Sequence, residues 1–400
     1  MNMNREAEGP LEGVRILDLS AVVSGPLATM ILGDQGAEVI KVEAPGIGDT
    51  LRGFGALRGG ISSTFVTLNR SKRSIVLDLR TEAGKEVLRD LVRWADVMIE
   101  NYRPGVMERL GFDYERCRVL NEDLIYVGIN GFGDEGPHAG RKVYDYVIQA
   151  IGGMAYAQAD PETGRPELVR TLIFDKTTAY TAAQAISAAL FARERGKGGQ
   201  RIRIAMLDVA LAFLWPDGMM SHTFLGDGAM NPPPFGKIYS LYETQDGFIT
   251  FGALSDSEWQ SICTAAERKD LAEDERFSTI MGRMMNLDDL RTVFREMVPE
   301  HTTEEWCKRF EANDVPHAPI LPLSEVHKHP QVRANAILEE SEHPAAGKFR
   351  QPLPAPKFSR TPAAPRRHAP LHGEHTDEVL SELGYPPERI EALRSAKAFG

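Results

Sequence analysis

The sequence has few cysteines and no long apolar run. Cys117, Cys263 and Cys307 are its only cysteines, and no two of them form a Cys-x-x-Cys pair. We therefore expect three buried or half-buried thiols in a reducing compartment rather than a disulfide framework or a zinc ribbon. No apolar stretch approaches the roughly 18 residues that a membrane-spanning helix needs, and Met1–Pro10 lacks the apolar core of a signal peptide. These features predict a cytoplasmic protein with no membrane partner.

Positive charge is also scarce. The chain carries 46 lysines and arginines against 57 aspartates and glutamates, a formal net charge of −11. A nucleic-acid partner is therefore not expected, since binding a phosphate backbone requires a positive surface that displaces counterions. A local basic pocket for a small phosphorylated ligand remains compatible with this charge.

Several familiar site motifs are missing. Gly46-Ile-Gly48 is not followed by the third glycine of a dinucleotide fingerprint, and neither a Walker loop nor a Gly-x-Ser-x-Gly elbow occurs. The histidines of His327–His329 and His368–His375 fall in or near proline-rich sequence without cysteines nearby, which favours solvated loop histidines over a metal site. We expect no metal, no prosthetic group and no standard nucleotide cofactor.

The first part of the chain alternates between strand and helix patterns. Apolar runs predict strands, and apolar residues three and four apart predict helices. This alternation indicates an α/β fold with a parallel sheet. The predicted strands are Val14–Asp18, Glu38–Val42, Ser74–Leu79, Asp96–Glu100 and Leu124–Ile129, and the predicted helices between them are Pro26–Leu32 and Glu82–Trp94.

After about residue 218 the pattern of predicted elements changes, which suggests a second domain. The length of 400 residues also exceeds what a single hydrophobic core usually supports. The pattern there predicts a hairpin over Ile238–Leu254 that turns at Gln245–Gly247. Residues 352–370 are proline-rich and suit an extended connector. The other predicted elements are helices over Tyr144–Met154, Thr178–Arg193, Met206–Leu214, Trp259–Ala266, Leu287–Met297, Thr376–Gly384 and Pro387–Lys397, and a strand over Arg201–Met206.

Blocks of sequence along nearly the whole chain resemble one known family. The most specific block is Ala95–Gly105 (ADVMIENYRPG). The others, in the same order and spacing, are Leu11–Ser20, Ser24–Pro26, Asp34–Glu43, Gly48–Asp49, Arg52–Gly53, Asn69–Ser74, Leu77–Asp78, Gly373–Asp377 and Glu382–Tyr385. Together they resemble the family III CoA transferases, the CaiB/BaiF-like superfamily that includes formyl-CoA and carnitine CoA-transferases.

The resemblance implies a fold that patterns alone do not give. Members have a Rossmann-like large domain built from both chain ends and a small α+β domain between them. Here the large domain would comprise residues 1–218 and 330–400, and the small domain residues 219–329. Members also form homodimers whose two chains are interlocked, so the expected protein partner is a second copy of this chain.

The resemblance also implies a site for coenzyme A as an acyl thioester substrate. Ala21 and Val23 stand where formyl-CoA transferases have histidine and glutamine, and Arg80 replaces a lysine. Arginine, lysine and aromatic side chains suit the phosphates and the nucleotide of the coenzyme. The implied contact residues are Val22, Val23, Ser24, Leu77, Arg80, Asn101, Tyr102, Arg109, Leu110, Lys142 and Met206.

Asp175 is the candidate catalytic residue. It lies ahead of the alanine-rich segment, where a helix N-terminus favours a carboxylate and offers N–H groups. The residues alone favour a simple N-cap, because aspartate is common at that position before a helix. The resemblance implies a nucleophile that forms a mixed anhydride with the donor acyl group and then an enzyme–CoA thioester. Relatives often have glycine or another small residue soon after it, whereas this chain has Lys176–Thr178.

Two other functions remain open at this stage. An α-methylacyl-CoA racemase of the same superfamily would need two acid/base groups and a histidine in a Gly-His-Asp stretch. The equivalent stretch here, Gly140–Asp145, has no histidine. A CoA-binding protein without activity is the second alternative. The favoured reaction transfers CoA from an acyl-CoA, perhaps succinyl-CoA, to a small carboxylic acid.

Overall fold

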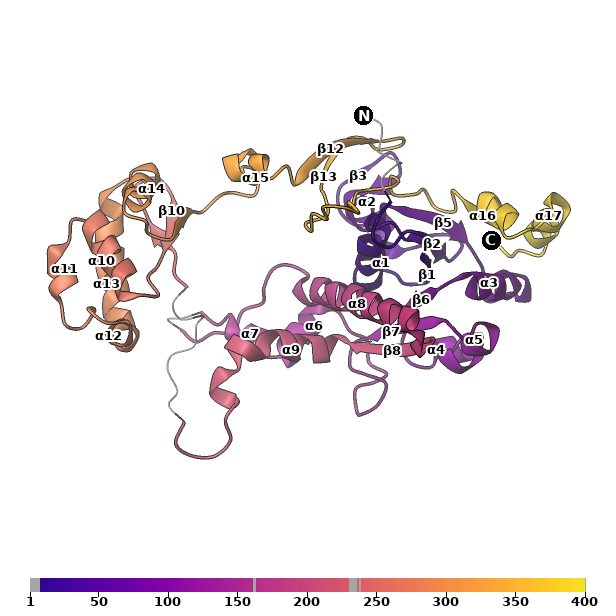
Figure 1. Ribbon diagram of the computed structural model, residues 1–400, viewed down its shortest axis with the longest axis horizontal. Helices are drawn as coiled ribbons and strands as arrows, with labels where there is room; N and C mark the ends of the chain where they lie inside the picture. The colour runs from indigo at the N-terminus through magenta and orange to yellow at the C-terminus, as the bar shows by residue number, and fades with distance from the viewer. Residues whose placement is uncertain (1–7, 161–162, 230–235, 237–238, 400) are drawn as a thin grey trace. The chain divides into compact units, whose positions relative to one another are not determined.

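The structure is a computed structural model that describes residues 8–160, 163–229, 236 and 239–399. The chain divides into two compact units (Figure 1). Unit 1 combines Met1–Gly153, Leu168–Phe213 and Val332–Gly400, and unit 2 combines Met154–Glu167 and Leu214–Gln331. Both ends of the chain thus belong to unit 1. The short segment Met154–Glu167 groups with unit 2, which the sequence pattern did not indicate.

A parallel sheet of six strands forms the centre of unit 1. Its order is β5-β2-β1-β6-β7-β8, and every neighbouring pair is parallel. Counted along the chain, the order is 3-2-1-4-5-6, that of a doubly wound fold whose direction of winding reverses between β1 and β6. The predicted α/β class with a parallel sheet is confirmed. The strands are β1 (Arg15–Asp18), β2 (Glu38–Glu43), β5 (Lys72–Val76), β6 (Val97–Glu100), β7 (Ile125–Asn130) and β8 (Gln200–Ala205).

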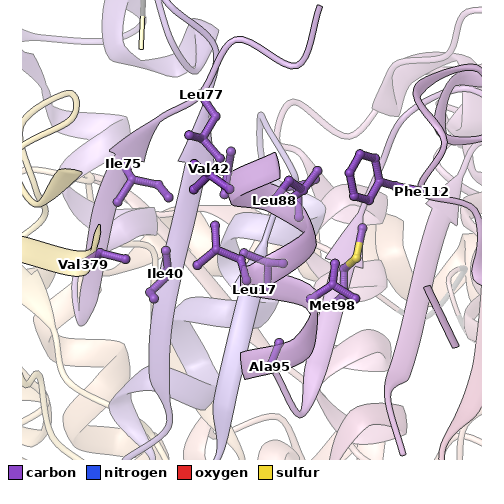
Figure 2. Packing of buried hydrophobic residues seen from close by; sticks show 14 of the residues in the cluster. Leu17, Ile40, Val42, Ile75, Leu77, Leu88, Ala95, Met98, Phe112 and Val379 are labelled. Carbon is purple, nitrogen blue, oxygen red and sulfur yellow. The ribbon is translucent and has the colours of Figure 1, made fainter. Parts of the chain in front are cut away.

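Helices cover both faces of this sheet, which is why inner strands such as β1 and β6 are buried apolar runs, whereas the edge strand β8 alternates. On one face, Ile16 and Val39 pack with α1 (Ser24–Asp34) and α8 (Ile173–Ala192). On the other face, Leu17 and Ile40 pack with Leu88 of α3 (Glu82–Trp94) and Val379 of α16 (Thr376–Glu382), as Figure 2 shows. The C-terminal segment therefore completes the core of the N-terminal strands.

One predicted helix is confirmed over most of its length but extends too far at its C-terminal end. The segment Tyr144–Met154 forms two short helices, α6 (Asp145–Ile151) and α7 (Met154–Ala157), because Gly152 and Gly153 separate them. Gly153 adopts a left-handed backbone with φ 88°, which ends the first helix. A side chain at Gly152 would also lie only 2.9 Å from the carbonyl oxygen of Ile148.

Unit 2 contains a small antiparallel sheet and its own core. The sheet order is β11-β10-β9, and Trp259, Phe294, Trp306 and Phe310 are buried beside it. The predicted hairpin is confirmed where the structure describes it, whereas Ile238 lies outside the described residues. The elements of this unit are β9 (Tyr242–Glu243), β10 (Phe248–Phe251), β11 (His317–Pro319), α10 (Asp256–Ala265), α11 (Lys269–Glu273), α12 (Ile280–Met285), α13 (Leu287–Met297) and α14 (Thr303–Ala312).

A second hairpin, β12 (Leu338–His343) with β13 (Gly347–Pro352), was not predicted, because its charged strands carry no apolar alternation. None of the helices in the described part of the chain is long and apolar enough to cross a membrane. The remaining elements are β3 (Leu57–Arg58), β4 (Ile61–Ser62), α2 (Ser63–Asn69), α4 (Val106–Leu110), α5 (Tyr114–Leu120), α9 (Met206–Gly218), α15 (Pro330–Ala334) and α17 (Pro387–Ser395).

Candidate active site

A cavity of about 330 Å³ opens at the carboxyl ends of the parallel strands in unit 1. It lies beyond the ends of β1 and β6, the neighbouring strands between which the winding reverses, and this is the place at which doubly wound sheets bind their ligands. Segments that follow β1, β6 and β7 line it, together with the first residue of α9 and one residue of α8. The lining residues are Val22, Ser24, Asn101, Tyr102, Arg103, Pro104, Ile129, Asn130, Gly131, Ala139, Arg141, Lys142, Val143, Tyr144, Asp175 and Met206.

Asp175 reaches this cavity from the first turn of α8. Its side chain is partly buried, and one oxygen, Oδ1, accepts a hydrogen bond of 2.8 Å from the hydroxyl of Ser24. Ser24 is the first residue of α1, so the bond joins two helices that pack against the same face of the sheet. The hydrogen bond leaves Oδ2 of Asp175 as the oxygen available to a ligand.

Asp145 explains where α8 begins. Its buried carboxylate accepts hydrogen bonds from the backbone N–H groups of Phe174 at 2.7 Å and Asp175 at 3.0 Å. These bonds satisfy two donors at the helix start, so α8 begins at Ile173 rather than at the predicted Thr178. Asp175 is not the N-cap residue, which is Leu172. The interpretation of Asp175 as a simple N-cap is therefore wrong.

The electrostatic setting of Asp175 favours a reactive carboxylate. Burial raises the pKa of Asp175 from 3.8 to about 6, the nearby charge of Asp145 also raises it, and the hydrogen bond from Ser24 opposes the rise. The ionised form is thus weakly solvated, although it still predominates above about pH 6. A weakly solvated carboxylate with a raised pKa is typical of catalytic sites, and a carboxylate of this kind can act as a nucleophile in group transfer.

The turn between β1 and α1 is held tightly against this site. Asn101, which follows β6, pairs with both backbone groups of Ala21, accepting from its N–H at 2.9 Å and donating to its carbonyl at 2.7 Å. Gly25 is required by close packing, because a Cβ there would lie 2.1 Å from Oγ of Ser20. These contacts hold the turn beside the segment that follows β6, and Val22 and Ser24 line the cavity there.

The predicted site residues separate into two groups in the structure. Lys142, Met206 and Tyr102 come to the cavity together with Val22, Ser24, Asn101 and Asp175. The other predicted contacts are elsewhere: Val23 and Leu77 are core residues with exposed fractions of 2% and 1%, and Arg80 is exposed and paired with Asp78. Arg109 and Leu110 end α4 outside this cavity. The roles of these five residues in binding the coenzyme stay predictions.

Sequence reasoning missed two cations at the cavity. Arg103 and Arg141 line it beside Lys142, and all three side chains are exposed. Within the described residues none of them forms a hydrogen bond or ion pair through its side chain, although most arginines of unit 1 do. The only signal in the sequence was their position next to Tyr102 and Lys142. Three cations without carboxylate partners make the cavity locally basic on an acidic protein.

Comparison with known proteins identifies the family to which this chain belongs. The model of CoA-transferase family III matches residues 11–376. The chain therefore belongs to CoA-transferase family III, as its sequence blocks suggested, and is an enzyme of the CoA-transferase class.

Individual relatives agree with this assignment. The chain is 35% identical to human succinyl-CoA:glutarate CoA-transferase, with 97% of this chain and 89% of the relative covered. It is 32% identical to the formyl-CoA:oxalate CoA-transferase of Rhodopseudomonas palustris, with 97% of each covered. The crystal structure of a CaiB/BaiF family protein from Brucella suis superposes with a TM-score of 0.80 at 30% identity, covering 94% of this chain and 100% of that one. The racemase alternative is not favoured by these relatives.

Proposed function

We propose that this enzyme transfers CoA from an acyl-CoA donor to a carboxylic acid through covalent intermediates on Asp175. The observation that supports this most is the place of Asp175: a partly buried carboxylate, in a basic cavity at the ligand-binding edge of the sheet, with one oxygen held by Ser24. A carboxylate so placed can attack a thioester whose phosphates lie toward Arg103, Arg141 and Lys142.

The proposed reaction conserves charge at each step. An oxygen of Asp175 attacks the thioester carbonyl, the C–S bond breaks, and the CoA thiolate leaves a mixed anhydride. The thiolate then attacks the aspartyl carbonyl, which releases the donor acid as a carboxylate and leaves an enzyme–CoA thioester. The acceptor carboxylate attacks this thioester, and the returning thiolate takes the acceptor acyl group from the second anhydride. Asp175 is regenerated as a carboxylate, and no proton is gained or lost.

The structure limits which groups can stabilise the developing oxyanion. The N–H groups of Phe174 and Asp175 donate to Asp145, so the helix start does not offer them to substrate. The helix N-terminus was expected to offer free N–H groups, and these two are instead bonded to Asp145. The hydroxyl of Ser24 is the polar hydrogen nearest to the nucleophile in the described contacts, and we propose that it moves between the carboxylate and the anhydride oxygen during transfer.

We propose small dicarboxylic acids as substrates. Relatives at 31–35% identity are named for succinyl-CoA and glutarate or for formyl-CoA and oxalate. A second carboxylate on donor or acceptor would complement the unpaired cations at the cavity, in addition to the phosphates of the coenzyme. Succinyl-CoA is the donor we would test first.

We also propose the family's quaternary arrangement: an interlocked homodimer in which residues 1–218 and 330–400 form the large domain and residues 219–329 the small one, in the cytoplasm. The side of α8 that faces away from the sheet supports the proposal that a second chain covers this helix. From residue 177 to its end at residue 192 it contains no charged residue, and Tyr180 and Phe191 are 61% and 66% exposed. A helix without charge on its outer side is typical of one that is buried in the assembly.

Trapping on Asp175 tests the proposed function. Incubation with succinyl-CoA and hydroxylamine should convert the activated aspartyl group to a hydroxamate, which peptide mass spectrometry locates. Asp175→Ala should abolish exchange of CoA between succinyl-CoA and a panel of carboxylic acids while CoA binding persists. Modification of a different carboxylate, or exchange that survives in Asp175→Ala, would contradict the proposal.

A further inference from the structure

The turn between β1 and α1 has a backbone that an unsupported chain avoids. Val22 lies in the left-handed region with φ 69°. This conformation is unfavourable for a β-branched side chain and persists only where the surroundings impose it. Val22 lines the cavity and is two residues from Ser24, whose hydroxyl bonds Asp175. The contacts that hold Val22 in this conformation therefore also influence the position of the Ser24 hydroxyl relative to Asp175.

A buried ion pair beneath the turn makes direct contact with its backbone. Lys41, on β2, donates from Nζ to the carbonyl oxygen of Ser20 at 2.7 Å and pairs with Oδ2 of Asp49 at 3.1 Å. Asp49 in turn accepts the backbone N–H of Val22 through Oδ1 at 3.2 Å. The two side chains of the pair are 0% and 1% exposed. The pair therefore connects the carbonyl of Ser20 with the N–H of Val22.

Further buried groups keep the pair in place. Lys72, also buried, donates to Oδ2 of Asp18 at 2.9 Å, and Asp18 accepts the N–H of Ser20 at 2.9 Å. Although burial by itself opposes it, the carboxylates of Asp18, Asp49 and Glu43 raise the pKa of Lys41, so its ammonium stays charged. With Asn101 bonded to Ala21, side chains from distant elements hold three consecutive residues of the turn.

Stability alone does not account for such an arrangement. Apolar residues of similar volume often stabilise a protein as well as a buried ion pair does, because both ions lose their hydration. What apolar residues lack is directional bonding to two backbone groups of a strained turn.

We propose that the Lys41–Asp49 pair is a positioning device that holds Val22 in its left-handed conformation and so places the hydroxyl of Ser24 on Asp175. Neither residue lines the cavity, so both act through the turn rather than on the substrate. This inference rests on the proposed role of Asp175.

Replacing the pair with apolar residues tests the device. The variant Lys41→Met/Asp49→Leu should fold, and its kcat should fall by about tenfold or more, since loss of a positioned hydrogen bond to a reacting group has effects of that size. Adding Val22→Gly should recover at least about threefold of the lost kcat, because glycine adopts a positive φ without strain. The milder Asp49→Asn keeps the acceptor for the N–H of Val22 and should lose less than about threefold.

A second buried pair of unit 1 provides the matched control. Arg70 and Asp34 pair at 2.7 Å with side chains 4% and 2% exposed, and neither contacts the turn. The control variant Arg70→Met/Asp34→Leu should alter the melting temperature and leave kcat unchanged. If the first double variant does not fold, Asp49→Leu with and without Val22→Gly gives the same comparison, because Lys41 keeps the nearby carboxylates of Asp18 and Glu43.

The outcomes separate this inference from the function on which it rests. Turnover that survives in Asp175→Ala, measured alongside, would overturn the proposed function. An inactive Asp175→Ala together with an unchanged kcat in Lys41→Met/Asp49→Leu would overturn the positioning role alone. A reduced kcat that Val22→Gly does not recover would also overturn it, because the loss would then not pass through the conformation of the turn.

Discussion

At the scale of single residues, the burial of Asp175, the proposed nucleophile, has a cost in stability. Because burial raises the pKa of Asp175 to about 6, the folded state holds the proton more tightly than the unfolded chain. The stabilising contribution of that proton is present at low pH and is lost as the pH rises through about 6. Above that pH the buried charge works against folding.

This cost leads to the first prediction. Asp175→Asn should raise the free energy of unfolding at pH 8 by about 2–3 kcal/mol, since a shift of one unit corresponds to about 1.4 kcal/mol. At pH 4 the gain should be small, because the folded carboxyl is then protonated. Denaturant titrations at both pH values measure it. An equal gain in the free energy of unfolding at pH 4 and pH 8 would mean that ionisation of Asp175 does not destabilise the folded state.

The hydroxyl of Ser24 should also influence the pKa of Asp175. It donates to Asp175 and lowers the pKa of that carboxyl against the effect of burial. Ser24→Ala should therefore move the acidic limb of the kcat/KM profile upward from about pH 6 and reduce turnover at neutral pH. Ser24→Thr, which keeps a hydroxyl, should restore the position of the limb. If Ser24 served only to contact the coenzyme, the alanine variant would raise KM and leave the limb where it was.

The cations at the cavity should bind the phosphates of the coenzyme, which all acyl-CoA donors share. Removing the ammonium in Lys142→Ala should weaken CoA binding about ten- to a hundredfold, the worth of a charge-assisted hydrogen bond of roughly 1.5–3 kcal/mol. The same prediction holds for Arg80 and Arg109, which lie outside the cavity. The loss should be equal for different donors and smaller at high salt, because Lys142 is exposed.

Calorimetric titration with CoA measures this loss, with Lys348→Ala as a control that removes an exposed lysine away from the cavity. A variant whose preference among acceptor acids changes while its CoA affinity stays intact would place that residue in the acyl site instead.

At the scale of elements, the start of α8 depends on a residue of another helix. Asp145→Ala removes the acceptor of two buried N–H groups and should lower the free energy of unfolding by about 1–3 kcal/mol. It should also reduce turnover, since Asp175 sits on the turn that loses its support. Asp145→Asn should retain more of both, because an amide oxygen still accepts a hydrogen bond.

The N-cap residue of α5 offers a control for this prediction. Asp113 accepts the N–H of Arg116 at 3.2 Å, and it does not line the cavity. Asp113→Ala should lose stability and keep its turnover. Equal turnover losses in Asp113→Ala and Asp145→Ala would show that activity follows overall stability rather than the position of the first turn of α8.

At the scale of the whole molecule, interlocked chains should not separate on dilution. Two linked chains can part only by unfolding, so sedimentation velocity should give a dimer at nanomolar as well as micromolar concentration. Tyr180→Glu, on the uncharged side of α8, should impair assembly and leave the chain aggregated or unfolded rather than as a folded monomer. A reversible monomer–dimer equilibrium would exclude the interlocked arrangement.

The local pattern of the sequence was sufficient for elements that its own residues stabilise. Helix α3 has the predicted bounds Glu82–Trp94, because Val87, Leu88, Leu91 and Val92 bury one stripe and Thr81 accepts the N–H of Gly84 at its start. The parallel sheet followed from buried apolar strands that alternate with helices. The family was indicated by the order and spacing of short blocks, and with it the candidacy of Asp175.

Only the tertiary structure decided how Asp175 is held. Ser24 and Asp175 are 151 positions apart, and Asp145 reaches the start of α8 from 30 positions away. Likewise, Lys41 and Asp49 read as polar residues at the end of a strand and in a loop, yet they are buried beneath the turn at Val22. Periodicity and propensity describe neighbours along the chain. The pKa of a carboxylate and the strain of a turn depend on burial and on hydrogen bonds between elements that meet only when the sheet has formed.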